Sequence, residues 1–288
     1  MENILTVNNI KKTYGRRLVL DDVSIKVPKG AIYGLIGKNG AGKTTLMRVI
    51  SSLQEPTSGS VEMGKARIGA MIDSPAYYPN LSAKQNLIAH CKALGLTSYD
   101  EVDELLKLVR LENTGRKSVS RFSFGMRQRL GIATALVGNP DIVLMDEPIN
   151  GLDPQGIIEM REVILDGNKT KGTTFIISSH LLDELSKVAT DYAFIDNGKI
   201  IKEISAKDLI ECSEKSYDAT VSDTSKVCTA LDDLGKRYKI ISDTKIRIED
   251  EITLGEMAQL AKDAGVELKE FSENDTSLEG YYINLVEG

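Results

Sequence analysis

The chain has 288 residues, of which 41% are hydrophobic and 27% are charged, and this composition predicts an ordinary folded protein with a large core and more than one unit. Its net charge of −6 and its pI of about 5.2 argue against a broad nucleic-acid surface, so no nucleic acid partner is expected. No stretch approaches the ~20 apolar residues of a membrane helix, and we expect no signal peptide. Cys91, Cys212 and Cys228 lack paired or metal-like spacing, which predicts reduced cytosolic thiols.

The first part of the chain predicts strands that lead into a glycine-rich turn. Residues 1–30 are typical of two or three antiparallel strands, with Gly15 in a turn. The apolar run at residues 31–36 predicts a buried strand, and a helix is expected to begin at Lys43. Between them, residues 37–45 read Gly-Lys-Asn-Gly-Ala-Gly-Lys-Thr-Thr and match the phosphate-loop pattern G-x-x-x-x-G-K-[ST].

The residue types in this turn are those that binding a phosphate chain requires. Glycines let successive N–H groups point at the phosphates, and the helix N-terminus adds about half a positive charge. Lys43 can reach the β- and γ-phosphates, and the Thr44 hydroxyl can ligate Mg²⁺. The alternative is a glycine-rich turn without a ligand. We expect these residues to bind the nucleotide: Gly37, Asn39, Gly40, Ala41, Gly42, Lys43, Thr44 and Thr45.

A second pattern places two carboxylates at the end of a short buried strand. After a mostly helical stretch over about residues 80–138, four apolar residues follow Asp141 and end at Asp146-Glu147. Open α/β sheets bind ligands at the carboxyl ends of their strands. Asp146 is therefore the candidate Mg²⁺ ligand, and Glu147 is the candidate general base for the attacking water. The alternative is an acidic strand end that caps a loop.

The third pattern is the segment 122–130, Phe-Ser-Phe-Gly-Met-Arg-Gln-Arg-Leu, which precedes an apolar helical stretch. At this point the chain resembles the ATP-binding cassette (ABC) family, whose Leu-Ser-Gly-Gly-Gln signature lies just upstream of the second acidic motif. Only Ser123 and Gly125 match its strictest form, and the variant is similar to that of drug- and antimicrobial-peptide-exporting cassettes. In the family this motif faces the nucleotide that the other subunit binds. The alternative is an ordinary serine-capped core helix.

The resemblance implies roles for further residues. Tyr14 matches the aromatic residue that stacks on adenine, although an exposed tyrosine in a turn is an alternative. Asp153 lies in Asn150-Gly151-Leu152-Asp153, which is similar to the loop that crosses the dimer interface. His180, after an apolar strand, is expected to bind the γ-phosphate and orient the attacking water, whereas His90 receives a structural interpretation.

Asp73 departs from the general pattern of the family. It aligns with the position where most cassettes have glutamine, and a carboxylate there can ligate Mg²⁺. Cassettes similar to the bacitracin-resistance and lantibiotic-immunity exporters often have an acidic residue at this position. The departure therefore favours that subgroup.

The resemblance covers about residues 1–215, and the rest is interpreted from its pattern alone. Residues 141–204 predict strand–helix alternation that ends in a hairpin turn at Asn197-Gly198. Beyond residue 215 the predicted order is strand, helix, two strands, helix, strand and a final helix, which contains the β-α-β-β-α-β ferredoxin-like motif. We interpret residues 216–288 as an accessory domain for dimerisation or regulation, or as a solvated appendage.

The patterns, together with the resemblance to the ABC family, predict an α/β fold: a P-loop NTPase-type ABC ATPase core with an antiparallel β subdomain and a helical subdomain, plus a small α+β ferredoxin-like C-terminal domain. The chain is expected to bind ATP and Mg²⁺ and to hydrolyse the ATP. This hydrolysis is expected to drive export of an antimicrobial peptide or drug. The resemblance implies two partners, a separate transmembrane permease and a second ATPase subunit, and a peripheral position on the cytoplasmic face of the membrane. The permease's coupling helices are expected to dock near Asp73–Asn80. The alternatives are a non-transport cassette in translation, DNA repair or metal-cluster assembly, and a nucleotide-regulated binding module without turnover.

Overall fold

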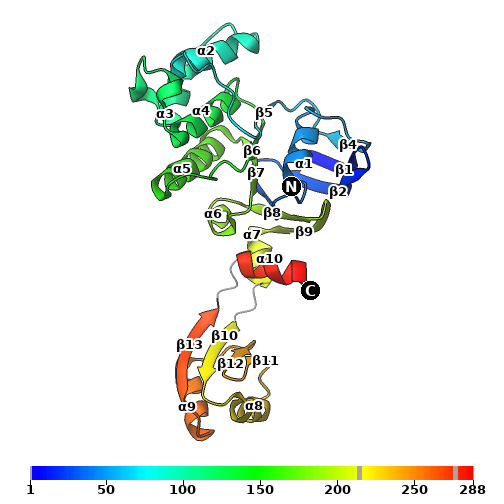
Figure 1. Cartoon of the computed structure of the whole chain (residues 1–288), viewed down its shortest axis with the longest axis vertical. Coiled ribbons are helices and arrows are strands. Elements are labelled where there is room, and N and C mark those ends of the chain that lie inside the picture. The colour runs from blue at the N-terminus through cyan, green and yellow to red at the C-terminus, as the bar shows by residue number, and fades with distance from the viewer. Residues whose placement is uncertain (1, 213–215, 275–277, 288) are drawn as a thin grey trace. The chain divides into compact units, whose positions relative to one another are not determined.

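The computed structural model describes residues 2–212, 216–274 and 278–287, and the chain divides into two compact units, residues 1–206 and 207–288 (Figure 1). The domain boundary predicted at residue 215 lies outside the described residues. Each unit has its own sheet or sheets. None of the helices among the described residues is both long enough and apolar enough to cross a bilayer.

The larger sheet of the first unit has the strand order β5-β6-β7-β3-β8-β9, in which β9 is antiparallel to β8 and the other pairs are parallel. The strand bounds are β3 Ile32–Ile36, β5 Ile68–Met71, β6 Ile142–Asp146, β7 Thr174–Ser179, β8 Asp191–Asp196 and β9 Lys199–Ser205. Every residue of β3, β6 and β7 is buried, as expected of apolar runs in a parallel sheet covered on both faces. Because Asp146 lies beside Ser178 and Ile36 beside Ser179, the carboxyl ends of these strands form one edge.

A smaller antiparallel sheet has the order β2-β1-β4. Its strands are β1 Asn3–Tyr14, β2 Arg17–Pro28 and β4 Ser58–Glu62. The first two confirm the strands expected in residues 1–30, and the third comes from beyond the phosphate loop. Alternating apolar residues of β1 and β2 share one core with α1 (Lys43–Ile50) and the larger sheet. This shared core fixes the helix that follows the glycine-rich turn against both sheets.

The helical stretch expected over about residues 80–138 is confirmed, and Figure 1 shows its three α-helices gathered away from the antiparallel sheet. It contains α2 Ala83–Ala93, α3 Glu101–Leu108, two short 3₁₀ turns at Glu112–Thr114 and Val119–Arg121, and α4 Phe124–Leu136. Ser82 and Gln85 form a capping box that starts α2. Leu94 is 53% exposed because it caps the C-terminus of α2, so its helical spacing did not place it in the core. Two more helices, α5 (Pro154–Lys171) and α6 (Leu182–Ser186), follow β6 and β7.

The hairpin turn predicted at Asn197-Gly198 is confirmed between β8 and β9. This turn contacts the phosphate loop. Both residues have positive φ, 46° and 76°, which suits this asparagine–glycine pair. Gly198 N donates to Ala41 O at 3.0 Å, inside the loop. A Cβ at Gly198 would lie 2.2 Å from Val19 O, so only glycine allows this approach.

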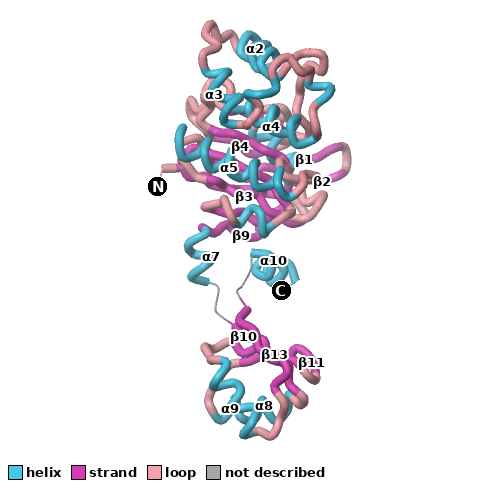
Figure 2. The backbone as a smooth tube through the Cα atoms, turned by 90° about the vertical axis from the view of Figure 1, so that its left-hand side faces the viewer, coloured by secondary structure: helices cyan, strands magenta, loops and turns pink. Residues whose placement is uncertain are grey.

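The second unit contains a four-stranded antiparallel sheet in the order β11-β12-β10-β13, with α8 and α9 on one face (Figure 2). Its elements are α7 Ala206–Cys212, β10 Ser216–Val221, α8 Thr224–Asp233, β11 Tyr238–Ser242, β12 Lys245–Ile248, α9 Leu254–Asp263, β13 Leu268–Asn274 and α10 Leu278–Glu287. The helices and strands predicted from pattern beyond residue 215 are all present, and apolar residues of α8 and α9 pack on alternate residues of the strands. Asp218, on the face away from these helices, is buried and paired with Arg247 and Lys245 at 2.8 and 2.9 Å.

The packing of α4 on β5 generates a stability prediction. A Cβ on Gly69 would lie 1.7 Å from Ala135 O, a contact that only a backbone shift can relieve. Gly69→Ala should therefore lower the free energy of unfolding by about 1–3 kcal/mol. Thermal or urea unfolding followed by circular dichroism measures the change. Ala70→Ser, on the neighbouring exposed position, is the control and should melt like the wild type; a Gly69→Ala protein with an unchanged melting curve would contradict the packing.

Candidate active site

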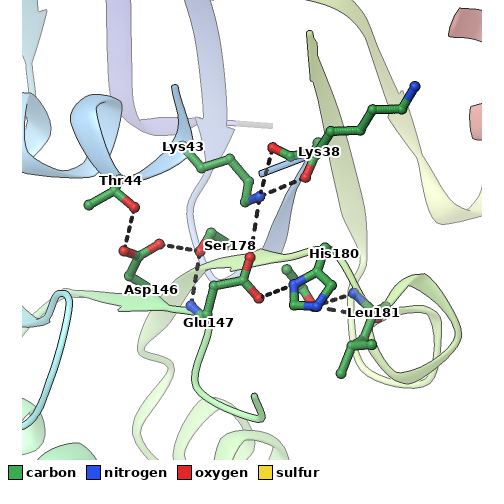
Figure 3. A network of polar contacts seen from close by, with 10 residues as sticks. Lys38, Lys43, Thr44, Asp146, Glu147, Ser178, His180 and Leu181 are labelled. Atoms are coloured by element: carbon green, nitrogen blue, oxygen red, sulfur yellow. Dashed lines mark hydrogen bonds and ion pairs between the residues drawn. The ribbon is translucent and has the colours of Figure 1, made fainter. Parts of the chain in front are cut away.

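The glycine-rich turn forms a loop around the Lys43 side chain. Gly40 and Gly42 have positive φ of 85° and 111°, and α1 begins directly afterwards. Lys43 is 6% exposed, and its Nζ donates to Gly37 O at 2.6 Å and to Lys38 O at 3.3 Å (Figure 3). The loop therefore encloses one cation at a helix N-terminus, an arrangement that suits a phosphate chain.

Asp146 joins the helix after the loop to the central strands. Its Oδ2 accepts a hydrogen bond of 2.6 Å from Thr44 Oγ1, and its Oδ1 accepts one of 2.5 Å from Ser178 Oγ. The carboxylate is 9% exposed, so these hydrogen bonds offset the cost of its burial. A hydroxyl oxygen and a carboxylate in contact are hard oxygen donors of the kind that Mg²⁺ prefers alongside phosphate oxygens and water. The donor set therefore fits Mg²⁺.

Glu147 lies between the loop lysine and the histidine. Its backbone has a positive φ of 49°, and its N–H donates to Ser178 Oγ at 3.0 Å. The Oε1 atom makes an ion pair of 3.2 Å with Lys43 Nζ that is not aligned as a hydrogen bond, and Oε2 contacts His180 Nδ1 at 2.8 Å (Figure 3). The structure thus brings together both candidate catalytic residues, and a carboxylate held this way can act as a general base.

A groove of about 450 Å³ opens beside this cluster, a volume in the range of ligand pockets. Its lining comprises Tyr14, Arg17, Val19, Asn39, Gly40, Gly42, Lys43, Thr44, Thr45 and Glu147. The Tyr14 ring is 41% exposed, its hydroxyl bonds to Gln54, and Lys12 Nζ lies 5.2 Å from its centroid. An exposed ring at the mouth of a polar groove offers a flat surface for stacking.

Ser123, Gly125 and Asp153 lie together in a different groove, of about 370 Å³, which shares no lining residue with the first. Ser123 starts α4 by accepting a hydrogen bond from Met126 N at 3.2 Å, and Asp153 starts α5 by accepting one from Gly156 N at 3.0 Å. Both residues therefore have a local capping role as well as their position in the groove.

Asp73 is held by an arginine. It lies 52% exposed after β5, and Arg48 Nη2 donates to its Oδ2 at 2.6 Å. The hydrogen bond to Asp73 is the main cause that raises the pKa of Arg48, and Tyr14 contributes less.

Of the two histidines, His90 lies in α2, where burial lowers its pKa and favours the neutral ring.

Sequence patterns did not identify Ser178 or Arg48. Ser178 is the penultimate residue of a predicted strand, two residues before His180, but its bond to Asp146 depends on the pairing of β6 with β7. Arg48 has no motif around it, because its role comes from the packing of α1 near the loop after β5. Arg17 and Val19 line the groove from β2 and also carry no local signal.

The phosphate loop, the paired carboxylates and the histidine define the class of phosphate-loop ATPases, and comparisons with known proteins specify the family. Residues 20–150 match the ABC transporter family model. The chain is 35% identical to the bacitracin transport ATP-binding protein BcrA of Bacillus licheniformis, covering 100% of this chain and 99% of that protein. It is 43% identical to the lantibiotic transport ATP-binding protein SrtF of Streptococcus pyogenes, covering 69% of this chain and 90% of that protein.

A solved structure agrees with these relatives. The ADP conformation of MJ1267, an ATP-binding cassette of an ABC transporter, has a TM-score of 0.65 at 25% identity, over 74% of this chain and 96% of that chain. The chain belongs to the ABC transporter family, as an ATP-binding subunit. The prediction of an ABC ATPase that hydrolyses ATP to drive transport is confirmed.

The geometry of the loop separates two neighbouring lysines. Lys43 points into the loop, whereas the Lys38 side chain points away from the cluster (Figure 3). Lys43→Ala should therefore reduce ATP turnover by at least about a hundredfold and weaken ATP binding, because it removes the cation inside the loop. Lys38→Ala is the matched control and should keep nearly full activity. Phosphate release by both purified proteins checks this, and near wild-type turnover by Lys43→Ala would refute the assignment of the loop.

Proposed function

We propose that this subunit powers the export of an antimicrobial peptide through a separate membrane protein. The observation that supports hydrolysis most directly is the placement of Glu147 between Lys43 and His180. The similarity to the bacitracin and lantibiotic transport proteins supports the class of cargo. Both Glu147 and His180 are present, which disfavours a binding module without turnover.

In this proposal ATP occupies the groove beside the phosphate loop, with adenine on Tyr14 and phosphates within the loop from Gly37 to Thr45. Thr44 and Asp146, together with Asp73, would hold Mg²⁺, which when bound neutralises phosphate charge and orients the phosphate chain. Glu147 accepts the proton of the attacking water. His180 holds the Glu147 carboxylate and orients the water.

We infer further that two subunits sandwich the nucleotide. Ser123, Gly125 and Asp153 lie in a groove separate from the phosphate loop, so within one chain they are not part of the same pocket. A second subunit brings its Ser123 and Gly125 to the first subunit's ATP, where the N-terminus of α4 attracts the phosphates. Closure on ATP and opening after hydrolysis then supply the stroke.

The membrane partner is proposed to dock on the segment from Asp73 to Asn80. Tyr78 in this segment is 63% exposed, and the segment starts at the edge of the sheet where Asp146 lies. Such a position links the permease to the ATP site. The subunit is then a peripheral protein on the cytoplasmic face of the membrane.

For the C-terminal part we propose a ferredoxin-like domain over residues 216–288, joined to an ATPase domain over residues 1–215. The strand order β11-β12-β10-β13, with α8 and α9 on one face, supports this fold. Fold alone does not assign its function, which we propose to be dimerisation or regulation.

The cargo proposal is tested in cells that co-express this chain with the permease that co-purifies with it. The wild-type pair should raise the minimal inhibitory concentration of bacitracin or a lantibiotic, and the pair with Glu147→Gln should not. Equal sensitivity with and without the active pair, across both peptide classes, would refute peptide export. That outcome would not contradict ATP hydrolysis by the subunit.

Replacement of the general base generates a second prediction for this function. Glu147→Gln should bind ATP but hydrolyse it about a hundred- to ten-thousand-fold more slowly, because the amide cannot take the proton. With Mg²⁺ and ATP, size-exclusion chromatography with light scattering should show a shift from monomer to dimer. Lys43→Ala/Glu147→Gln is the control and should stay monomeric. A monomer under saturating ATP, with the permease present as well, would contradict the sandwich.

A further inference from the structure

The carboxylate expected to ligate metal is already engaged by the helix that starts at the phosphate loop. Arg48 occupies the last turn of α1, and its Nη2 donates to Asp73 Oδ2 at 2.6 Å. The backbone at Asp73 is left-handed, with φ of 65°, and Ser74 N donates to Ile72 O at 2.9 Å across it. One ion pair therefore ties the tight turn after β5 to α1.

The position of this turn makes the ion pair relevant to the site. In the parallel pairing of β5 with β6, Met71 lies opposite Met145, so Asp73 leaves the sheet at the edge that carries Asp146 and Glu147. Three carboxylates at one edge repel one another and any phosphate chain nearby. The Arg48 guanidinium reduces that repulsion by pairing with Asp73. The same hydrogen bond also keeps the Asp73 carboxylate oriented toward Arg48.

The ion pair is suited to exchange. The Arg48 and Asp73 side chains are 34% and 52% exposed, and ion pairs this accessible to water are weak. A divalent cation, with twice the charge and a preference for carboxylate oxygens, can compete for the same group. Arg48 stays on α1 whichever partner Asp73 has, because α1 is fixed by the core shared by both sheets.

We propose, on the basis of the nucleotide site proposed above, that Arg48 is a positioning residue that exchanges Asp73 with Mg²⁺. Arg48 holds the carboxylate while the site lacks metal and releases it when Mg²⁺ binds with ATP. Because the turn at Asp73 begins the segment proposed to face the permease, this exchange reports metal loading to that segment. In the competing explanation, Arg48 neutralises Asp73 permanently. The two explanations predict different dependences of nucleotide binding on Mg²⁺ when Arg48 is replaced.

The test is equilibrium binding of a fluorescent ATP derivative to the full chain at a series of Mg²⁺ concentrations, in a Glu147→Gln background that prevents turnover. Arg48→Met frees Asp73 for the metal, so half-maximal binding should need roughly two- to fivefold less Mg²⁺. Permanent neutralisation predicts instead weaker binding of the ATP derivative at saturating Mg²⁺, because removing the guanidinium adds net negative charge beside the phosphates. An unchanged or higher Mg²⁺ requirement would therefore overturn the proposal.

Matched variants isolate the exchange from other effects. With Asp73→Asn also present, Arg48→Met should no longer lower the Mg²⁺ requirement, since no carboxylate remains to be freed; a persistent shift would overturn the role of Asp73. Lys84→Met breaks another exposed ion pair, the 2.7 Å contact with Asp103, and should change nothing. Arg48→Lys keeps the charge and should behave like the wild type; an Mg²⁺ requirement as low as that of Arg48→Met would overturn the role of the ion pair. Arg48→Gln, which is polar and uncharged, should show the same shift as Arg48→Met and covers the case in which Arg48→Met does not fold.

The same titrations separate this inference from the proposed function. If the Glu147→Gln protein with native Arg48 does not bind the ATP derivative at any Mg²⁺ concentration, the nucleotide site itself is wrong. If it binds and the Arg48→Met curve coincides with it, only the exchange is wrong.

Discussion

The buried carboxylate of Asp146 is the interaction on which the rest of the site depends. It ends β6 and accepts hydrogen bonds from Thr44 on α1 and from Ser178 on β7, so three segments distant in the sequence meet at one group. A buried carboxylate is costly unless such bonds are made, and the protein therefore favours one relative placement of these segments. The parallel order β6-β7-β3 makes this possible, because it gathers the strand ends at one edge.

The arrangement of the candidate catalytic residues follows from that placement. Ser178 binds both the Asp146 carboxylate and the Glu147 backbone, which turns the Glu147 side chain toward Lys43 and His180. Lys43 is thus paired with Glu147 in the structure described here, in the place where the proposed function puts phosphate oxygens. In the proposed function, phosphates that enter the loop would compete with Glu147 for this cation. The proposal therefore links nucleotide binding to release of Glu147, the proposed general base.

How far the sequence predicts this molecule depends on whether a feature is local. The phosphate loop and its following helix are encoded in consecutive residues, and the Asn197-Gly198 turn needs only its two positive φ angles. The apolar run before Asp146 likewise predicts a buried strand. Ser178 and Arg48 could not be predicted from local sequence. Strand pairing brings Ser178 to its partner, and packing between elements brings Arg48 to its partner. Leu94 has helical spacing but lies at a helix end, where no neighbour covers it well enough to bury it.

The central claim is that the Asp146 cluster is the ATP site and that a second subunit completes it. A structure of the Glu147→Gln protein with Mg²⁺ and ATP tests this most directly. We predict phosphates within the loop at Lys43, the metal at Thr44 and Asp146, Ser178 still bonded to Asp146, and the partner's Ser123 against the γ-phosphate. ATP bound in the phosphate loop with Ser123 of both copies open to solvent would contradict the sandwich. ATP bound away from Lys43 would contradict the site itself.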